Sequence, residues 1–183
     1  PAPKKEIAYT RTFGQPVHDL QSLIEAITEY TSRAAEKLRR QKSFASAILV
    51  FIHTSKHCAG PQYARSITVP LVRPASDTNS LLSAAVRGLR TIYKPGYDLI
   101  KAGVILMDLT STTVQQTELY FGSSMSDKTD QLMWTIDRLN DKYGRGTIIY
   151  GSAGIGKKEW AMNQQRKTPG YTAVVKDIPI ALA

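Results

Sequence analysis

Apolar residues in the first 110 positions follow two kinds of spacing, which predict strands and helices. Residues 7–17 and 63–72 are rich in β-branched and aromatic side chains and are bounded by glycine or proline, as strands are. Residues 45–53 form a continuous apolar run, which is typical of a strand buried in the middle of a sheet. Residues 103–109 are similarly apolar and predict a fourth strand.

Helical spacing separates these predicted strands. After Asp19, a predicted N-cap, apolar residues recur three and four positions apart as far as Leu38. Asp77 or Thr78 caps a second predicted helix. The apolar stripe of that helix consists of Leu81, Leu82, Ala85, Leu89 and Ile92, and Lys94-Pro95-Gly96 ends it. Both helices therefore have one apolar face that needs another element to cover it.

The order of these elements predicts an α+β domain of β-α-β-β-α-β type over residues 1–110. Two helices on one face of a four-stranded sheet would leave the other face free. Residues 111–126 are rich in Thr, Ser and Gln and predict a linker. Residues 127–183 predict a small α/β module, with a helix over residues 127–143 and a short strand at residues 147–150. The chain starts with a proline in a Lys- and Pro-rich stretch, so we expect a fragment of a longer protein.

The net charge of +9 and the pI of about 9.7 favour a polyanionic partner, although a soluble protein can also be basic without one. Most of this charge lies in residues 1–110. Cys58 is the only cysteine, which excludes an internal disulfide and fits a reducing compartment. No apolar run reaches the roughly 20 residues of a membrane helix, and no signal peptide is visible. We therefore expect a cytoplasmic protein without a membrane partner, which would be nucleoid-associated if its polyanionic partner is DNA.

Small polar and basic residues on the predicted strands are candidates for contacts with DNA phosphates. Small hydroxyl side chains let backbone N–H groups approach a phosphate, and the basic residues add charge. Such contacts position a duplex without reading its sequence. The candidate DNA-binding residues are Thr10, Arg11 and Thr12 on the first strand, Lys56 in a loop, Arg65 and Ser66 on the third strand, and Lys101 at the start of the fourth.

Two other kinds of site are weaker alternatives. Residues 151–158 nearly match a phosphate-binding loop, but Lys158 stands where Mg²⁺ needs a hydroxyl. His53, His57 and Cys58 lie close together, but no second cysteine completes a zinc site. We therefore expect no metal site and no catalytic residues in this chain.

Two further interpretations concern the whole first domain. An RNA-recognition module has the same element order, yet the third predicted strand lacks the aromatic residues that stack on bases. A protein-interaction module whose basic charge is incidental is the other interpretation. The missing aromatic residues argue against the RNA module, whereas the protein-interaction module stays open.

Several segments, by their order and spacing, resemble the little-finger domain of UmuC-like Y-family translesion DNA polymerases. In the first domain these are Tyr9–Gly14, Ala34–Arg39, Ile48–Ile52 with His53-Thr54-Ser55 after it, and Lys101–Val104. In residues 127–183, which we call the tail, they are Met133–Tyr143 with Gly144-Arg145-Gly146 after it, Trp160–Met162 and Pro169–Thr172. The resemblance thus extends over nearly the whole chain.

This resemblance implies the DNA-gripping part of an error-prone polymerase of the SOS response. It assigns the phosphate contacts to the candidate residues above, with a damaged template–primer duplex as the ligand. The catalytic carboxylates that hold Mg²⁺ would belong to a palm domain upstream of Pro1, so no cofactor is expected in this fragment. A UmuD-type dimer is an expected partner of the tail.

A short peptide in the predicted linker has the Q-x-x-L-x-F spacing of segments that dock on a bacterial sliding clamp. Its residues are Gln116, Leu119 and Phe121. Tyr120 separates the Leu and Phe that are adjacent in many relatives, and the alternative register that begins at Gln115 spoils the spacing. Two apolar side chains would fill a groove of the clamp, while the Gln amide forms hydrogen bonds at its edge. The flexible tether would raise the effective concentration of the peptide once DNA is bound.

Overall fold

The computed structural model describes residues 4–57, 60–111, 123–156, 158 and 160–162. Its elements are β1 (Ile7–Val17), α1 (Leu20–Arg40), β2 (Ser43–Thr54), β3 (Ala64–Ala75), α2 (Thr78–Ile92), β4 (Leu99–Ser111), α3 (Ser123–Tyr143) and the short 3-10 helix η2 (Gly151–Ala153). The α+β class and the predicted order of four strands and two helices in the first domain are therefore confirmed.

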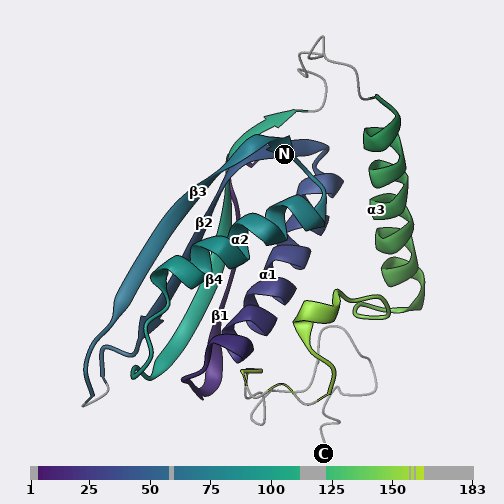
Figure 1. The fold of residues 1–183 in the computed structure, drawn as a ribbon. Helices are drawn as coiled ribbons and strands as arrows, with labels where there is room; N and C mark the ends of the chain where they lie inside the picture. Colours follow the sequence, from purple (N-terminus) through teal and green to yellow (C-terminus); the bar gives the residue numbers. More distant parts are fainter. Residues whose placement is uncertain (1–3, 58–59, 112–122, 157, 159, 163–183) are drawn as a thin grey trace, which may run out of the picture.

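The four strands form one antiparallel sheet in the order β1-β4-β2-β3. β4 and β2 lie in the centre, whereas β1 and β3 are the two edges. The last strand in the sequence thus separates the first two, and each helix connects strands that are not adjacent in the sheet. Figure 1 shows the strands as one twisted layer, with α1 and α2 packed on the same side of it.

The hydrophobic core lies between the sheet and these two helices. Ile48, Val50 and Ile52 of β2 are fully buried in it. Both helices begin as predicted, because a carboxylate caps each of them. Asp19 accepts from the Ser22 N–H at 2.7 Å, and Asp77 accepts from the Ser80 N–H at 2.8 Å. These caps satisfy backbone donors that have no partner inside the helix.

Two predicted features after the sheet need correction. α3 begins at Ser123, inside the segment predicted as a linker, and β4 extends to Ser111. The prediction of a strand at residues 147–150 is wrong. A side chain forms hydrogen bonds with backbone groups that would otherwise pair with a neighbouring strand. Asn140 accepts from the Ile148 N–H at 2.9 Å and donates to the Ile148 carbonyl at 3.1 Å.

The chain after α3 returns to the first domain and packs on α1. In Figure 1 the yellow-green segment around η2 lies beside α1, while α3 stands apart from the sheet. Trp160 joins the core of the first domain and is only 5% exposed. At the edge of the sheet, the Gly14 N–H donates to the Ala161 carbonyl at 3.1 Å. The described part of residues 150–162 is therefore packed into the same body as the sheet.

Candidate nucleic-acid interface

The strand register sorts the candidate DNA-binding residues onto two faces of the sheet. Directly paired residues in neighbouring antiparallel strands project to the same face. Thr12 pairs with Lys101, which pairs in turn with His53. In the adjacent row on the same face, the paired residues are Thr10, Gly103, Phe51 and Ser66. We call the surface formed by these two rows the open face.

The open face is the side of the sheet opposite α1 and α2. On β2, Leu49, Phe51 and His53 are half-buried, whereas the residues between them are fully buried under the helices. Within the described parts of the chain, no helix covers the open face (Figure 1). The open face thus brings together the predicted contacts Thr10, Thr12, Ser66 and Lys101.

Gly103 lies at the centre of the open face and lets two side chains lie close above the backbone. A Cβ atom at this position would come within 2.6 Å of Thr10 Cγ2 and 2.7 Å of Phe51 Cζ. Such distances are too short for carbon atoms in contact. The missing side chain therefore allows the Phe51 ring to lean over β4, next to the His53 ring. The two rings are nearly parallel, with an interplanar angle of 14° and centroids 6.1 Å apart.

Arg11 and Arg65 project from the face of the sheet that carries α1 and α2, opposite the open face. Arg11 pairs with Ala102 and Arg65 pairs with Ile52, and both partners are buried under the helices. The Arg11 guanidinium donates to the Tyr9 hydroxyl at 3.3 Å and lies 5.0 Å from the centroid of the Tyr9 ring. The candidate residues therefore do not all lie on one face. Because β1 and β3 are edge strands, the two arginines flank the open face.

Lys56 belongs to a groove at the end of the sheet where β2 turns toward β3. The groove has a volume of about 600 Å³. It is lined by His53, Thr54, Lys56, Gln62, Tyr63, Ala64 and Arg65, with no carboxylate among them. Lys56 and Arg65 thus line the same hollow as the open-face residue His53. We call this hollow the basic groove.

The structure argues against a phosphate-binding loop at residues 151–158. A Cβ atom at Gly154 would lie 2.6 Å from the Glu25 carboxyl carbon, so this turn packs directly on an acidic side chain of α1. The Lys158 ammonium forms an ion pair with Glu29, also on α1. Two carboxylates therefore face the turn in which a phosphate would have to sit, and they would repel it.

No metal site is found within the described residues, where no group of three or more His, Cys, Asp and Glu side chains could hold an ion. Cys58 lies outside the described residues, so the histidine and cysteine cluster is only partly visible. Within it, His53 Nδ1 lies 2.9 Å from the Thr54 carbonyl oxygen. The clamp-binding candidates Gln116, Leu119 and Phe121 also lie outside the described residues, and their role stays a prediction.

Sequence reasoning missed the contribution of β2 to the open face. Residues 45–53 are apolar on both sides of the strand, so no alternation marked Phe51 and His53 as uncovered. The one available signal was Gly103, since a glycine inside a strand often marks the close approach of another group. Of the described helices, none is both long and apolar enough to cross a membrane.

Two family models match the chain, one on either side of residue 120. Residues 4–119 match the impB/mucB/samB family C-terminal domain. Residues 130–181 match a domain of unknown function, DUF4113. The boundary between the matches falls after the sheet and before the middle of α3.

Curated relatives align with almost the whole chain. Protein SamB of Salmonella typhimurium is 36% identical over 182 residues, which are 99% of this chain. Protein UmuC of Salmonella typhimurium strain LT2 is 35% identical over 96% of this chain, and Protein MucB of Escherichia coli is 33% identical over 99% of it. The chain spans 42% of the length of each of these relatives.

Two solved structures show weaker likeness. An insertion ternary complex of Dbh DNA polymerase matches 58% of this chain and 29% of its own, with a TM-score of 0.48 and 13% identity. The little finger domain of PolIV, in a complex with the β-clamp processivity factor, matches 63% of this chain and 99% of its own, with a TM-score of 0.38 and 15% identity.

Proposed function

Because this chain belongs to the impB/mucB/samB family, we propose that it is the DNA-gripping part of an error-prone translesion DNA polymerase of the SOS response. The observation that carries the proposal is the open face, where Lys101 lies between Thr12 and His53 on the side of the sheet that none of the described helices covers. A cation and small hydroxyl groups are among the side chains that contact phosphates and so position a duplex without reading its sequence. The ligand would be the damaged template–primer duplex, held without regard to sequence.

The proposal places the duplex across the open face and uses the flanking cations to follow its backbone. The small hydroxyl residues of the open face would let phosphates approach the strands. Arg11 and Arg65 would reach around the two sheet edges, and Lys56 would act from the basic groove. The polymerase reaction itself would use Mg²⁺ held by carboxylates of a palm domain elsewhere in the full-length protein. We further propose that the full-length protein works in the cytoplasm, at the nucleoid.

The salt dependence of DNA binding tests this assignment. Removing one phosphate contact should reduce the slope of log K against log salt by about one unit. We therefore expect Lys101→Gln to bind primed duplex DNA more weakly, with the slope reduced by about one. The matched control is Lys94→Gln, which removes an exposed lysine after α2 and should leave the slope unchanged. Equal slopes for Lys101→Gln and the parent chain would contradict the proposed DNA surface.

Recruitment by a bacterial sliding clamp is the second part of the proposed function. Gln116, Leu119 and Phe121 have the spacing that such a clamp would accept. Calorimetric titration of the chain into the clamp should show binding that the Leu119→Ala/Phe121→Ala variant loses. Gln115→Ala is the matched control, because Gln115 lies one position outside the motif and its loss should change the affinity little. Equal affinity of the double variant and the parent chain would remove the peptide from the proposal.

A UmuD-type dimer is the third proposed partner, with residues 127–183 as its contact surface. The described part of this region exposes several large apolar side chains, among them Leu132 and Trp134 on α3 and Ile155 after η2. Apolar side chains exposed in this way are available for contacts with another protein. The ion pairs that α3 forms with α1 would hold this surface in a fixed position beside the DNA-binding sheet.

A further inference from the structure

The basic groove holds a histidine among permanently charged side chains. His53 lines the groove together with Arg65 from β3 and Lys56 from the turn after β2. Its register partner on β4 is Lys101. The charged side chains that line the described groove with His53, and the one paired with it in the strand register, are all cations. The carboxylate of Asp98, just before β4, instead lies 3.2 Å from the imidazole of another histidine.

The hydrogen bond of His53 fixes which ring nitrogen is available to a ligand. Nδ1 lies 2.9 Å from the Thr54 carbonyl oxygen, which can only accept, so Nδ1 carries a proton. Nε2 of the neutral ring then has a lone pair and cannot donate to a phosphate oxygen. Nε2 of the protonated ring carries a hydrogen and a share of the positive charge, so it can donate. Only the protonated ring is therefore a phosphate ligand in this orientation.

The surroundings of His53 hold it in this orientation. The Phe51 ring lies nearly parallel to the His53 ring. Phe51 can adopt this position because Gly103 has no side chain to occupy the same space. The adjacent Thr54 is buried, and its hydroxyl accepts from the Tyr63 N–H at 3.0 Å. This hydrogen bond closes the end of the β2–β3 hairpin beside the groove. The position of the imidazole thus depends on the strands rather than on a loop.

We propose that His53 is a DNA phosphate ligand that binds only in its protonated form, as the third contact of the row with Thr12 and Lys101. The inference rests on the proposed DNA-binding function. It adds His53 to the phosphate contacts and makes the affinity for DNA depend on pH. A phosphate in the basic groove brings negative charge next to His53, which favours the protonated ring. DNA binding therefore takes up a proton at His53, and the affinity for DNA increases as the pH falls.

The test compares salt series at two pH values with primed duplex DNA as the probe. At about pH 6 we expect the parent chain to bind roughly 3- to 10-fold more tightly than at about pH 8, with a slope steeper by about one phosphate contact. His53→Gln should abolish this difference between the two pH values. His57→Gln is the matched control, since it removes an exposed histidine of the neighbouring turn and should preserve the difference.

Proton uptake gives a second readout that does not depend on absolute affinity. Binding enthalpies measured in two buffers of different ionisation enthalpy should show net proton uptake by the parent chain and none by His53→Gln. A pH difference and proton uptake that survive in His53→Gln would overturn the proposal. DNA binding that depends on Lys101 but not on pH would overturn only this inference, whereas no salt-dependent binding at either pH would overturn the proposed function itself.

Discussion

Replacing Trp160 by alanine is expected to lower the free energy of unfolding by about 3 kcal/mol, at the lower end of the range for a buried aromatic residue. The indole is 5% exposed and meets the Tyr30 ring edge to face, with centroids 5.8 Å apart and an interplanar angle of 85°. Its N–H lies 3.4 Å from the Glu25 carboxylate, and the Lys158 ammonium lies 4.8 Å from the ring centroid. One side chain thus makes a ring contact and a hydrogen bond with α1, and a cation–π contact with the segment after η2.

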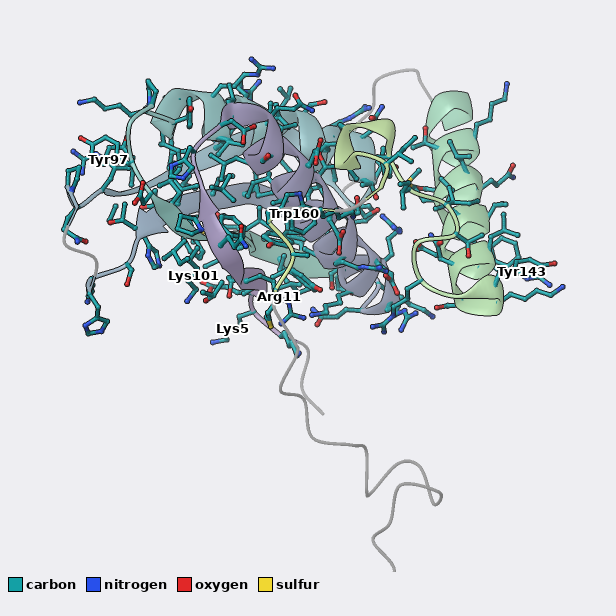
Figure 2. The ribbon with its side chains drawn as sticks, turned by 90° about the horizontal axis from the view of Figure 1, so that it is seen from below. Lys5, Arg11, Tyr97, Lys101, Tyr143 and Trp160 are labelled. Carbon is teal, nitrogen blue, oxygen red and sulfur yellow. The ribbon has the colours of Figure 1, made fainter. Side chains whose placement is uncertain are left out.

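The second tryptophan supplies the control for this prediction. Trp134 on α3 is 61% exposed, so Trp134→Ala should change the unfolding free energy by no more than about 0.5 kcal/mol. Urea unfolding followed by circular dichroism measures both variants. Figure 2 shows Trp160 over the body of the molecule, whereas α3 with Tyr143 lies at its outer end. Similar losses for the two variants would mean that Trp160 does not anchor the tail.

The Trp160→Ala variant also bears on the proposed UmuD-type partner. If residues 127–183 form the contact surface, an unanchored tail should bind that dimer more weakly, while Trp134→Ala would act only through a direct contact. Binding of the dimer by Trp160→Ala with unchanged affinity would show that the position of the tail on α1 does not matter for this partner. The dimer would then have to bind α3 or another part of the full-length protein.

Replacing Arg39 by alanine is the second large effect that we expect, with a loss of about 2–3 kcal/mol in unfolding free energy. The guanidinium donates to both Asp137 oxygens, at 2.6 and 2.7 Å, and to the Ser76 carbonyl at 2.8 Å. It also donates to the Thr78 hydroxyl at 3.0 Å. The side chains of Arg39 and Asp137 are 15% and 21% exposed, so water can replace these bonds only in part.

Arg40 offers a matched control one residue away. It pairs with Glu36 and Asp141, but its side chain is 51% exposed, and ion pairs in water contribute little. Arg40→Ala should therefore cost less than about 1 kcal/mol in the same chemical denaturation experiment. A double variant, Arg39→Met/Asp137→Leu, should recover part of the loss, because it leaves neither member of this pair as an unpaired charge between α1 and α3. Equal losses for Arg39→Ala and Arg40→Ala would contradict the special role of Arg39.

Ionisation of two tyrosines sets an upper pH limit for these experiments. Burial, followed by the nearby Glu29 carboxylate and Tyr9, raises the pKa of Tyr30 above its ordinary value. Burial is also the main cause that raises the pKa of Tyr150. A raised pKa in the folded state favours the neutral phenol, so its contribution to stability is complete below about pH 10 and declines as the pH rises beyond the ordinary tyrosine value.

The first domain could be predicted from its sequence because local and long-range signals agree there. Asp19 and Asp77 are capping residues at helix starts, and the apolar stripes after them match one buried face each. The strand order could not be predicted, since both central strands are apolar and the spacing alone does not say which of them pairs with β1. Thr147 to Tyr150 looked like a strand because β-branched and aromatic residues cluster there, yet Asn140 satisfies part of its backbone instead.

The candidate site was predicted less completely than the fold. The threonines, Ser66 and Lys101 share the open face, whereas Lys56 lines the basic groove. The one-residue steps from Thr10 to Arg11 and from Arg65 to Ser66 put the arginines on the opposite side. The alternation of side chains along a strand predicts that neighbouring residues lie on opposite faces. Which of the two faces is covered by helices becomes clear only from the strand register. The tail could not be predicted for another reason: its anchor, Trp160, contacts residues of α1 that lie far away in the sequence.

The strand order also has a consequence for how the protein is made. β1 is hydrogen-bonded to the sheet through β4, which is the last strand of the domain to be synthesised. At roughly 5–20 residues per second, a ribosome needs about 4 to 16 s for the roughly 80 residues between them. During that time the nascent β1 has no partner strand. The four-stranded sheet cannot form, because β4 must lie between β1 and β2. We therefore expect a late, all-or-none folding step on the ribosome, with a transient need for chaperones that ends once β4 has left the exit tunnel.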